Sequence, residues 1–198
     1  MRIGVLALQG AFAEHITVLS RLGVETLEVR LPQQLANLDG LVIPGGESTT
    51  ISRLMREYQL DTHIIRLALD GMAVMGTCAG MIVLATRVDS LNSPTLGLMD
   101  ISVRRNAFGR QVDSFETDLE VPAIGAEPFK GIFIRAPVVT SVGPKVEVLC
   151  RLSTGDIVAV RQGKCLAMAF HPELTDDTRF HRYFINMVSG VTIAKSSC

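Results

Sequence analysis

The first 86 residues alternate short apolar runs with amphipathic segments, and this alternation constrains the fold more than any other feature. The apolar runs cover residues 3–8, 26–29, 40–43 and 72–75. Near-continuous runs of this kind are typical of parallel strands that are buried on both faces. Parallel strands need crossover connections, so helices between them must cover the sheet. The pattern predicts an α/β fold with three layers, a mostly parallel sheet with helices on both faces.

Helices are expected between these runs. An apolar stripe with helical spacing begins at Phe12. Ser48 or Thr49 is expected to cap a second helix, and Asp61 a third. A further apolar helix is expected over residues 81–86. In sheets of this type, ligands bind outside the carboxyl ends of the strands, so the loops that follow the apolar runs are the expected location of a site.

The second half of the chain has a different pattern. Short strand-like runs separated by Gly, Pro and Asp extend from about residue 95 to 170, which predicts a β-rich second half. Asp176 is expected to open a terminal amphipathic helix, and residues 191–198 are expected to form a loose tail. We therefore predict a single domain over residues 1–190. Residues 87–100 receive no assignment.

The composition excludes several classes of protein. A chain of 198 residues buries a full hydrophobic core, about 70% of its unfolded surface, without disulfide or metal staples. Its 19 basic and 20 acidic residues give no overall field that would hold nucleic acid or an anionic membrane. Mean hydropathy is high at +0.33, but the longest apolar stretch, residues 79–85, is far shorter than the ~20 residues of a membrane span. No leader with a cleavage site is evident, so we expect a cytoplasmic protein.

Gly76-Thr77-Cys78-Ala79-Gly80 follows an apolar run and precedes a helix. This setting is typical of a nucleophile elbow, with Cys in place of Ser. The small neighbours allow a sharp turn, and the N-terminus of the next helix favours the thiolate. The alternative is a buried core cysteine, which is the usual place of an isolated Cys. Cys150 and Cys165 lie in strand patterns and are expected in the core, and Cys198 lies in the tail.

A cysteine nucleophile needs a base, and His171 is the best candidate. It ends an apolar run, and His171-Pro172-Glu173 places a carboxylate two residues later. In an extended backbone both side chains point the same way, so Glu173 could orient the imidazole. The tripeptide alone could equally form a turn. His15 and His63 are expected on the surfaces of helices, and His181 on the terminal helix without a partner. No cluster has the spacing of metal ligands.

Pro44-Gly45-Gly46-Glu47-Ser48 follows another buried run. The amide of Gly46, together with that of Ala79, could form an oxyanion hole. A phosphate loop is the alternative, but the sequence has no Gly-Lys-Ser/Thr ending, and a plain turn also remains open. Two arginine-bearing segments, residues 104–110 and 133–137, could supply a guanidinium for an α-carboxylate or could simply be solvated surface.

With these motifs, the chain resembles the class I, triad-type glutamine amidotransferases, which have a flavodoxin-like fold. Further segments resemble the family of glutaminase subunits of pyridoxal 5'-phosphate synthase, and no motif position departs from the family pattern. These segments are Leu8-Gln9-Gly10-Ala11, Glu14-His15, Gly45-Gly46-Glu47-Ser48-Thr49-Thr50, Arg105-Asn106, Phe108-Gly109-Arg110-Gln111-Val112-Asp113-Ser114-Phe115, Phe133-Ile134-Arg135-Ala136-Pro137 and Phe170-His171-Pro172-Glu173-Leu174.

The resemblance implies hydrolysis of L-glutamine to glutamate and ammonia through a γ-glutamyl thioester. It implies that Cys78, His171 and Glu173 are the nucleophile, the base and the orienting acid, with no cofactor and no metal. The glutamine contacts that it implies are Gly46, Glu47, Ser48, Arg105, Ile134 and Arg135. It further implies that ammonia passes to a synthase subunit in a large hetero-oligomeric complex used in vitamin B6 biosynthesis. We expect that partner to contact the region of Gln9, Gly10 and the first helix.

Three alternatives remain open at this stage. The chain could serve another synthase, or it could be a related cysteine hydrolase of the intracellular-protease type. It could also be a flavodoxin-like binding module without catalysis, in which Cys78 is merely buried. The reactivity of the Cys78 thiol separates the last alternative from the first two.

Overall fold

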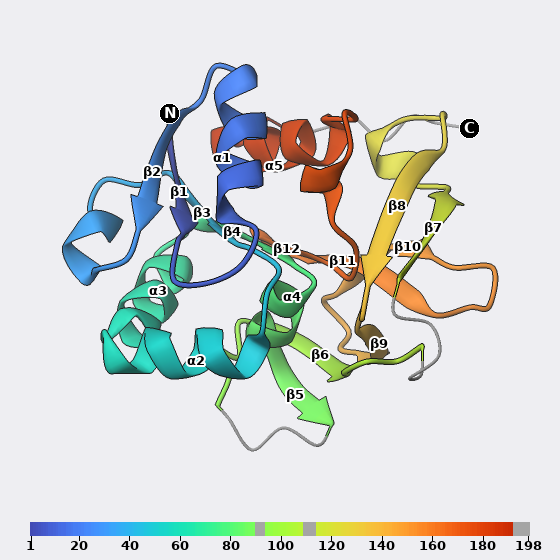
Figure 1. Ribbon diagram of the computed structural model, residues 1–198, viewed down its shortest axis with the longest axis horizontal. Coiled ribbons are helices and arrows are strands. Elements are labelled where there is room, and N and C mark those ends of the chain that lie inside the picture. Colours follow the sequence, from blue (N-terminus) through green and yellow to red (C-terminus); the bar gives the residue numbers. More distant parts are fainter. Residues whose placement is uncertain (90–93, 109–113, 192–198) are drawn as a thin grey trace.

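The computed structural model describes residues 1–89, 94–108 and 114–191. The centre of the molecule is a run of parallel strands in the order β2-β1-β3-β4-β12 (Figure 1). Their bounds are β1 Arg2–Leu6, β2 Glu25–Val29, β3 Gly40–Ile43, β4 Ala73–Thr77 and β12 Cys165–Met168. Every residue of β3 and β4 is buried, as the near-continuous apolar runs predict.

Helices cover both faces of this sheet. One face carries α1 and α5, and the other carries α2, α3 and α4 (Figure 1). Their bounds are α1 Phe12–Arg21, α2 Ser48–Glu57, α3 Leu60–Leu69, α4 Ala79–Leu84 and α5 Arg179–Ser189. The predicted three-layer α/β fold is confirmed.

The second half is β-rich, as predicted, and it extends the sheet with mainly antiparallel strands. Beyond β12 the order continues β11-β9-β6-β5, β10 pairs with β11, and β7 and β8 form a separate antiparallel pair. The bounds are β5 Ala85–Asp89, β6 Met99–Arg104, β7 Ser114–Leu119, β8 Phe129–Ile134, β9 Val138–Val142, β10 Glu147–Arg151 and β11 Ile157–Gln162. Short 3₁₀ turns occur at η1 Pro32–Leu35, η2 Pro122–Ile124 and η3 Pro172–Leu174. Of residues 87–100, which received no assignment from the sequence, 87–89 belong to β5 and 99–100 to β6, and 90–93 lie outside the described residues.

A cluster of phenylalanines attaches the β7-β8 pair to the main sheet. The rings of Phe129 and Phe180 lie 4.8 Å apart between centroids, and those of Phe133 and Phe170 lie 5.5 Å apart. All four side chains are fully buried. Aromatic pairs at such distances contribute beyond the area they bury. The cluster therefore fixes the end of β8 relative to the end of β12, where the candidate base begins.

The cap of α2 differs from the prediction. Glu47 occupies the N-cap position, and its carboxylate accepts hydrogen bonds from the amides of Thr49 (3.0 Å) and Thr50 (2.7 Å). The predicted caps, Ser48 and Thr49, instead lie in the first turn. A carboxylate satisfies two of the amides that lack an intrahelical acceptor, and its charge suits the helix dipole.

Other helix boundaries also differ. Helix α3 begins one residue before Asp61, whose charge therefore lies in the first turn rather than at the cap. Helix α4 spans Ala79–Leu84 rather than residues 81–86, because Thr86 already belongs to β5. Helix α5 begins at Arg179, not at Asp176, and the Asp177 carboxylate accepts a hydrogen bond from the Arg179 amide at 3.0 Å. The predicted tail lies almost entirely outside the described residues.

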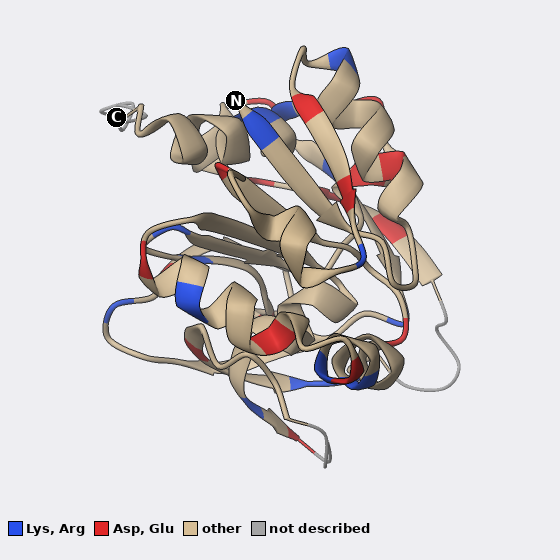
Figure 2. Cartoon of the chain, turned by 90° about the vertical axis from the view of Figure 1, so that its left-hand side faces the viewer, with Lys and Arg blue, Asp and Glu red and all other residues tan. Residues whose placement is uncertain are grey.

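Charged side chains are spread over the surface. Acidic and basic residues are interspersed on the face that Figure 2 shows, in keeping with the nearly balanced composition. Within the described ranges, each helix lacks the combination of length and apolar character that a bilayer crossing needs.

Candidate active site

Cys78 lies in the predicted sharp turn between β4 and α4. Its backbone has φ 48° and ψ −103°, a conformation that L-residues rarely adopt. Hydrogen bonds from its amide to the Met168 carbonyl (2.8 Å) and from the Met81 amide to its own carbonyl (3.1 Å) hold the turn. Strain of this kind costs about 1–3 kcal/mol and persists only where the surroundings enforce it. The predicted elbow is therefore present in the structure.

The glycines of the elbow are required by close packing. A Cβ on Gly76 would meet the backbone of Gly80, and a Cβ on Gly80 would meet the carbonyl oxygen of Ile43. The start of α4 therefore touches the end of β3, where the Gly45-Gly46 loop begins. The amide of Ala79 lies in the first turn of α4, among the amides that have no intrahelical acceptor.

The Cys78 thiol is 7% exposed and contacts the carbonyl oxygen of Ile134 at 3.7 Å. Cys150 and Cys165 are buried in strands, as predicted, and are free thiols. Burial raises the pKa of each of these two thiols to about 11. Both are therefore protonated and unreactive at neutral pH.

His171 lies just beyond β12, and its amide donates to the Ile132 carbonyl of β8 at 2.9 Å. Its Nδ1 lies 2.7 Å from Oε1 of Glu173, and both side chains are almost fully buried. The pairing of His171 with Glu173 agrees with the prediction, but the extended backbone from which it was predicted is wrong. Pro172 begins a 3₁₀ turn, so the segment is not extended, and the turn itself brings the carboxylate back to the imidazole.

The electrostatics of this pair favour charge on both partners. Burial lowers the pKa of His171, but interactions with Cys78 and Glu173 outweigh burial and raise it to about 10. Burial likewise raises the pKa of Glu173, and the neighbouring His15 and His171 outweigh it, so the net shift is downward. At neutral pH, Glu173 is therefore a carboxylate and His171 carries a proton next to Cys78.

The loops after β1 and β3 interlock beside this pair. The Ala11 amide donates to the Gly45 carbonyl (3.0 Å), and the Glu47 amide donates to Oε1 of Gln9 (2.7 Å). A Cβ on Gly45 would run into the imidazole of His171. The glycine loop is thus in direct contact with the candidate base, which places Gly46 at the same end of the sheet.

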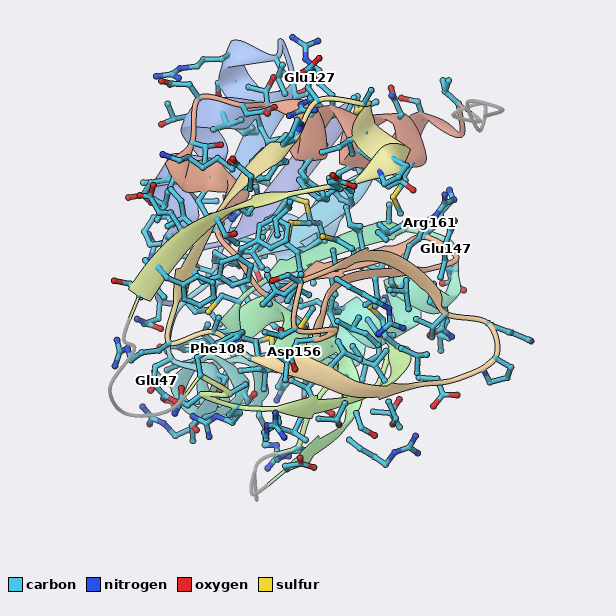
Figure 3. The ribbon with its side chains drawn as sticks, turned by 90° about the vertical axis from the view of Figure 1, so that its right-hand side faces the viewer. Glu47, Phe108, Glu127, Glu147, Asp156 and Arg161 are labelled. Carbon is cyan, nitrogen blue, oxygen red and sulfur yellow. The ribbon has the colours of Figure 1, made fainter. Side chains whose placement is uncertain are left out.

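Arg105 and Arg135 approach the loop region from the second half of the chain. Arg105 lies 3.4 Å from the Glu47 carboxylate, and Figure 3 shows Glu47 and Phe108 on the same side of the molecule. Arg135, which follows β8, has φ 44° and is a second strained position, next to Ile134, whose carbonyl contacts Cys78.

Arg110 and the rest of residues 109–113 lie outside the described residues. Ser48 is buried on α2.

The comparisons with known proteins now decide the family. The model of the SNO glutamine amidotransferase family matches residues 5–190. The chain belongs to the SNO glutamine amidotransferase family. The match covers almost the whole described chain, and the predicted resemblance is confirmed.

Individual members of the SNO family are similar over nearly their full length. The protein named pyridoxal 5'-phosphate synthase subunit PdxT of Herpetosiphon aurantiacus is 58% identical over 190 residues, which is 94% of this chain and 100% of the relative. The protein of the same name from Carboxydothermus hydrogenoformans is 56% identical over 95% of this chain and 98% of its own. A crystal structure described as a glutamine amidotransferase is 52% identical and has a TM-score of 0.90 over 94% of this chain and 98% of its own.

Two histidines of this SNO family member lie where the sequence analysis did not place them. His15 was expected on the surface of α1 and His181 on α5 without a partner, but both are completely buried. Their rings are joined by a contact of 3.0 Å between His15 Nδ1 and His181 Nε2. His15 also lies 3.3 Å from Glu173. They were missed because they are 166 residues apart; the polar residues on the sheet-facing side of two amphipathic helices were the available signal.

Among the residues that the structure describes, no group of three or more His, Cys, Asp or Glu side chains is arranged to hold a metal ion. The groups near Cys78 are instead the protonated imidazole of His171, the carboxylate of Glu173 and backbone amides of the neighbouring loops. Such a group can activate a thiol, stabilise an oxyanion and protonate a leaving group.

Proposed function

We propose that this protein hydrolyses the side-chain amide of L-glutamine through a Cys78, His171 and Glu173 triad and supplies the ammonia to a pyridoxal 5'-phosphate synthase subunit. The observation that carries the proposal is the strained elbow of Cys78 beside an imidazole that Glu173 holds at 2.7 Å. Membership of the SNO glutamine amidotransferase family gives the substrate class.

In the first half of the reaction the Cys78 thiolate attacks the side-chain amide carbon of glutamine. The carbonyl π electrons move to oxygen, and the amides of Gly46 and Ala79 stabilise the resulting oxyanion. The His171 imidazolium then gives its proton to the amide nitrogen. The C–N bond breaks, ammonia leaves, and a γ-glutamyl thioester remains on Cys78.

In the second half, water replaces ammonia. Neutral His171 takes a proton from water, and the oxygen adds to the thioester carbon. Collapse of this intermediate breaks the C–S bond, which releases glutamate and restores the thiolate beside the imidazolium. Glu173 keeps Nδ1 protonated throughout, so that Nε2 is the nitrogen available for the proton transfers.

The proposed glutamine contacts lie in the loop after β3, just after β6 and at the end of β8. The Glu47–Arg105 pair offers one carboxylate for an α-amino group and one guanidinium for an α-carboxylate. The other contacts, which bind through backbone or short side chains, are Gly46, Ser48, Ile134 and Arg135. No resident cofactor or metal takes part in this scheme, and the location that we propose is cytoplasmic.

The partner is proposed to dock on the face formed by α1 and η3. A cavity of about 280 Å³ lies between these elements, and its lining includes Glu14, Arg21, Glu173 and Leu174. Leu174 is an exposed large apolar side chain. A partner that covers this face would lie beside Glu173 and near Gln9 and Gly10. Ammonia that escaped into bulk water would be protonated, so a docked partner would have to receive it directly.

Glutamate release from L-glutamine tests the proposal, with the protein alone and with a cognate synthase subunit. We expect strong stimulation by the partner, and no release by Cys78→Ala under either condition. Cys150→Ala is the matched control and should behave as the wild type. Equal glutamate release with and without the synthase subunit would reject the proposed role in pyridoxal 5'-phosphate synthesis. No glutamate release under either condition would reject the glutaminase activity.

A further inference from the structure

The Glu173 carboxylate has two oxygens, and the proposed mechanism uses one of them. Oε1 holds His171, while Oε2 lies 3.3 Å from Nε2 of His15. The side chains of His15 and Glu173 are both fully buried. Within the described part of the chain, Oε2 makes no hydrogen bond of good geometry, and Nε2 of His15 is the nitrogen that lies within ion-pair distance of it. A buried carboxylate oxygen is expensive unless a donor faces it, so the proton on His15 matters.

The second buried histidine decides where that proton lies. His15 Nδ1 contacts His181 Nε2 at 3.0 Å, and His15 Nε2 lies 3.2 Å from the hydroxyl of Thr77. Nδ1 of His181 is buried and has no partner among the described residues. If His15 donated from Nδ1, His181 would carry its proton on this unpartnered nitrogen. The lone pair of His15 Nε2 would also face the carboxylate.

The opposite arrangement has neither fault. His181 Nε2–H donates to His15 Nδ1, and His15 Nε2–H points toward Glu173 Oε2 and the Thr77 hydroxyl. Among the described residues, Nδ1 of His181 then stays unpaired as an acceptor, which costs less than a buried N–H without a partner, and Glu173 Oε2 faces an N–H in place of a lone pair. This assignment requires both rings to be neutral. Burial lowers the pKa of His15 and lowers that of His181 to about 3, which satisfies the requirement.

We propose that His15 and His181 are positioning residues, which present one fixed N–H to Glu173 and so hold its carboxylate charged and oriented toward His171. This inference rests on the proposed glutaminase function and extends the triad inward by two side chains. The order runs from His181 on α5 through His15 on α1 to Glu173 on η3, and α1 and α5 lie on the same face of the sheet in Figure 1. Neither histidine contacts the reacting atoms.

The pH dependence follows from the groups that face His15. These are Glu173 on η3, His171 before it, His181 on α5 and Thr77 on β4, with Glu14 on its own helix. Without the N–H of His15, the Glu173 carboxylate is less stable as an anion. It then supports the proton on His171 less well, so His171 loses this proton at a lower pH. The alkaline limb of activity should therefore move to lower pH.

A direct test needs neither glutamine nor a partner. Nitrogen-15 NMR of the imidazoles in the full chain distinguishes the two neutral tautomers and the charged ring. We expect His15 and His181 both to be neutral and protonated on Nε2 near pH 7. A charged His15, or a proton on His15 Nδ1, would overturn the proposal.

A functional test compares His15→Leu with His15→Gln in the complex with the synthase subunit. The Gln side chain keeps an N–H near the position of Nε2, and Leu does not. We expect Leu to lower kcat by about ten- to a hundredfold with little change in KM, and to move the alkaline limb down by about one pH unit. Gln should restore most of both. Phe184→Leu on α5 is the control for general loss of stability and should keep the wild-type pH profile.

Alkylation of Cys78 by iodoacetamide, followed by mass spectrometry across pH, tests the positioning role of His15 separately from the proposed glutaminase activity. The reaction needs no glutamine, so it reports on the thiolate even if the glutaminase proposal fails. A folded His15→Leu variant with the wild-type pH profile of alkylation, or a Gln variant no better than Leu, would refute the positioning role. If His15→Leu does not fold, His181→Phe is compared with His181→Gln in the same way.

Discussion

Gly45 shows how closely the environment of the base is packed. A methyl group at this position would run into the imidazole of His171. We therefore expect Gly45→Ala to lower kcat/KM for glutamate release by about a hundredfold, because displacing a catalytic group by about 1 Å is enough for such a loss. Gly163→Ala is the control: its methyl group enters open space, and at φ 57° it strains the backbone of a distant turn without displacing a side chain. Equal losses in the two variants would contradict the steric explanation.

The charge of Glu173 contributes to the proton affinity of His171. Burial lowers the pKa of His171, but the interactions with Cys78 and Glu173 together raise it from 6.5 to about 10. The stability that this proton contributes is complete below the ordinary pKa and is lost as pH rises through the folded value. Glu173→Gln keeps the shape but removes the charge, so the alkaline limb of kcat/KM should move below pH 10. A pH–rate profile checks this, and an unchanged limb would contradict the assignment.

Single residues were predictable from sequence where their local setting carried the signal. Cys78 follows an apolar run between small residues, and this neighbourhood alone predicts the elbow. For His15 and His181 the local signal was weaker, because each is one polar residue on the sheet-facing side of an amphipathic helix. Their meeting depends on how α1 and α5 pack on the sheet, which local periodicity does not determine.

At the scale of elements, Glu47 is the N-cap of α2. Its carboxylate caps α2, and hydrogen bonds from Thr50 and Thr49 outweigh the effect of burial and lower its pKa to about 2. The stabilisation is therefore present above the ordinary pKa of 4.5 and is lost as pH falls through about 2. We expect Glu47→Ala to lower the free energy of unfolding in urea by about 1 kcal/mol at neutral pH.

Glu57→Ala is the matched control for this cap. Glu57 lies in the last turn of the same helix in an exposed pair with Arg53 at 3.8 Å, so its loss should cost less than about 0.5 kcal/mol. Equal costs in the two variants would show that Glu47 is not the cap. Because Glu47 is also a proposed glutamine contact, its variant should additionally raise KM, whereas Glu57→Ala should not.

Strands and helices were predictable as elements, but their ends were not. The apolar runs located β1, β3 and β4, since burial on both faces leaves little room for polar residues. A helix cap depends on which side chain reaches the free amides of the first turn. At α2 these amides bind the Glu47 carboxylate and not the hydroxyls of Ser48 or Thr49. The 3₁₀ turn at Pro172 was likewise hidden, because a Pro is compatible with both extended and turn geometry.

At the scale of the whole molecule, the proposed docking face of α1 and η3 lies beside Glu173. Glu14 is exposed there and lines the cavity next to Glu173. We expect Glu14→Lys to weaken the complex with the synthase subunit by about tenfold or more, because reversing a charge within a docking face disturbs its electrostatic complementarity. Analytical ultracentrifugation measures this, with Glu57→Lys on α2 as the control. Unchanged assembly of the Glu14 variant would contradict the proposed docking face.

The central claim is that Cys78 is the nucleophile toward a glutamine side chain. Its most direct test is peptide mapping by mass spectrometry after reaction with 6-diazo-5-oxo-L-norleucine, a glutamine analogue with an electrophilic carbon. Among the three cysteines that the structure describes, the account predicts an adduct on Cys78 alone, with Cys150 and Cys165 unmodified because burial keeps their pKa values near 11. L-glutamine should protect Cys78 from the reagent. Labelling of Cys150 or Cys165 at an equal rate, or no labelling of Cys78, would contradict it.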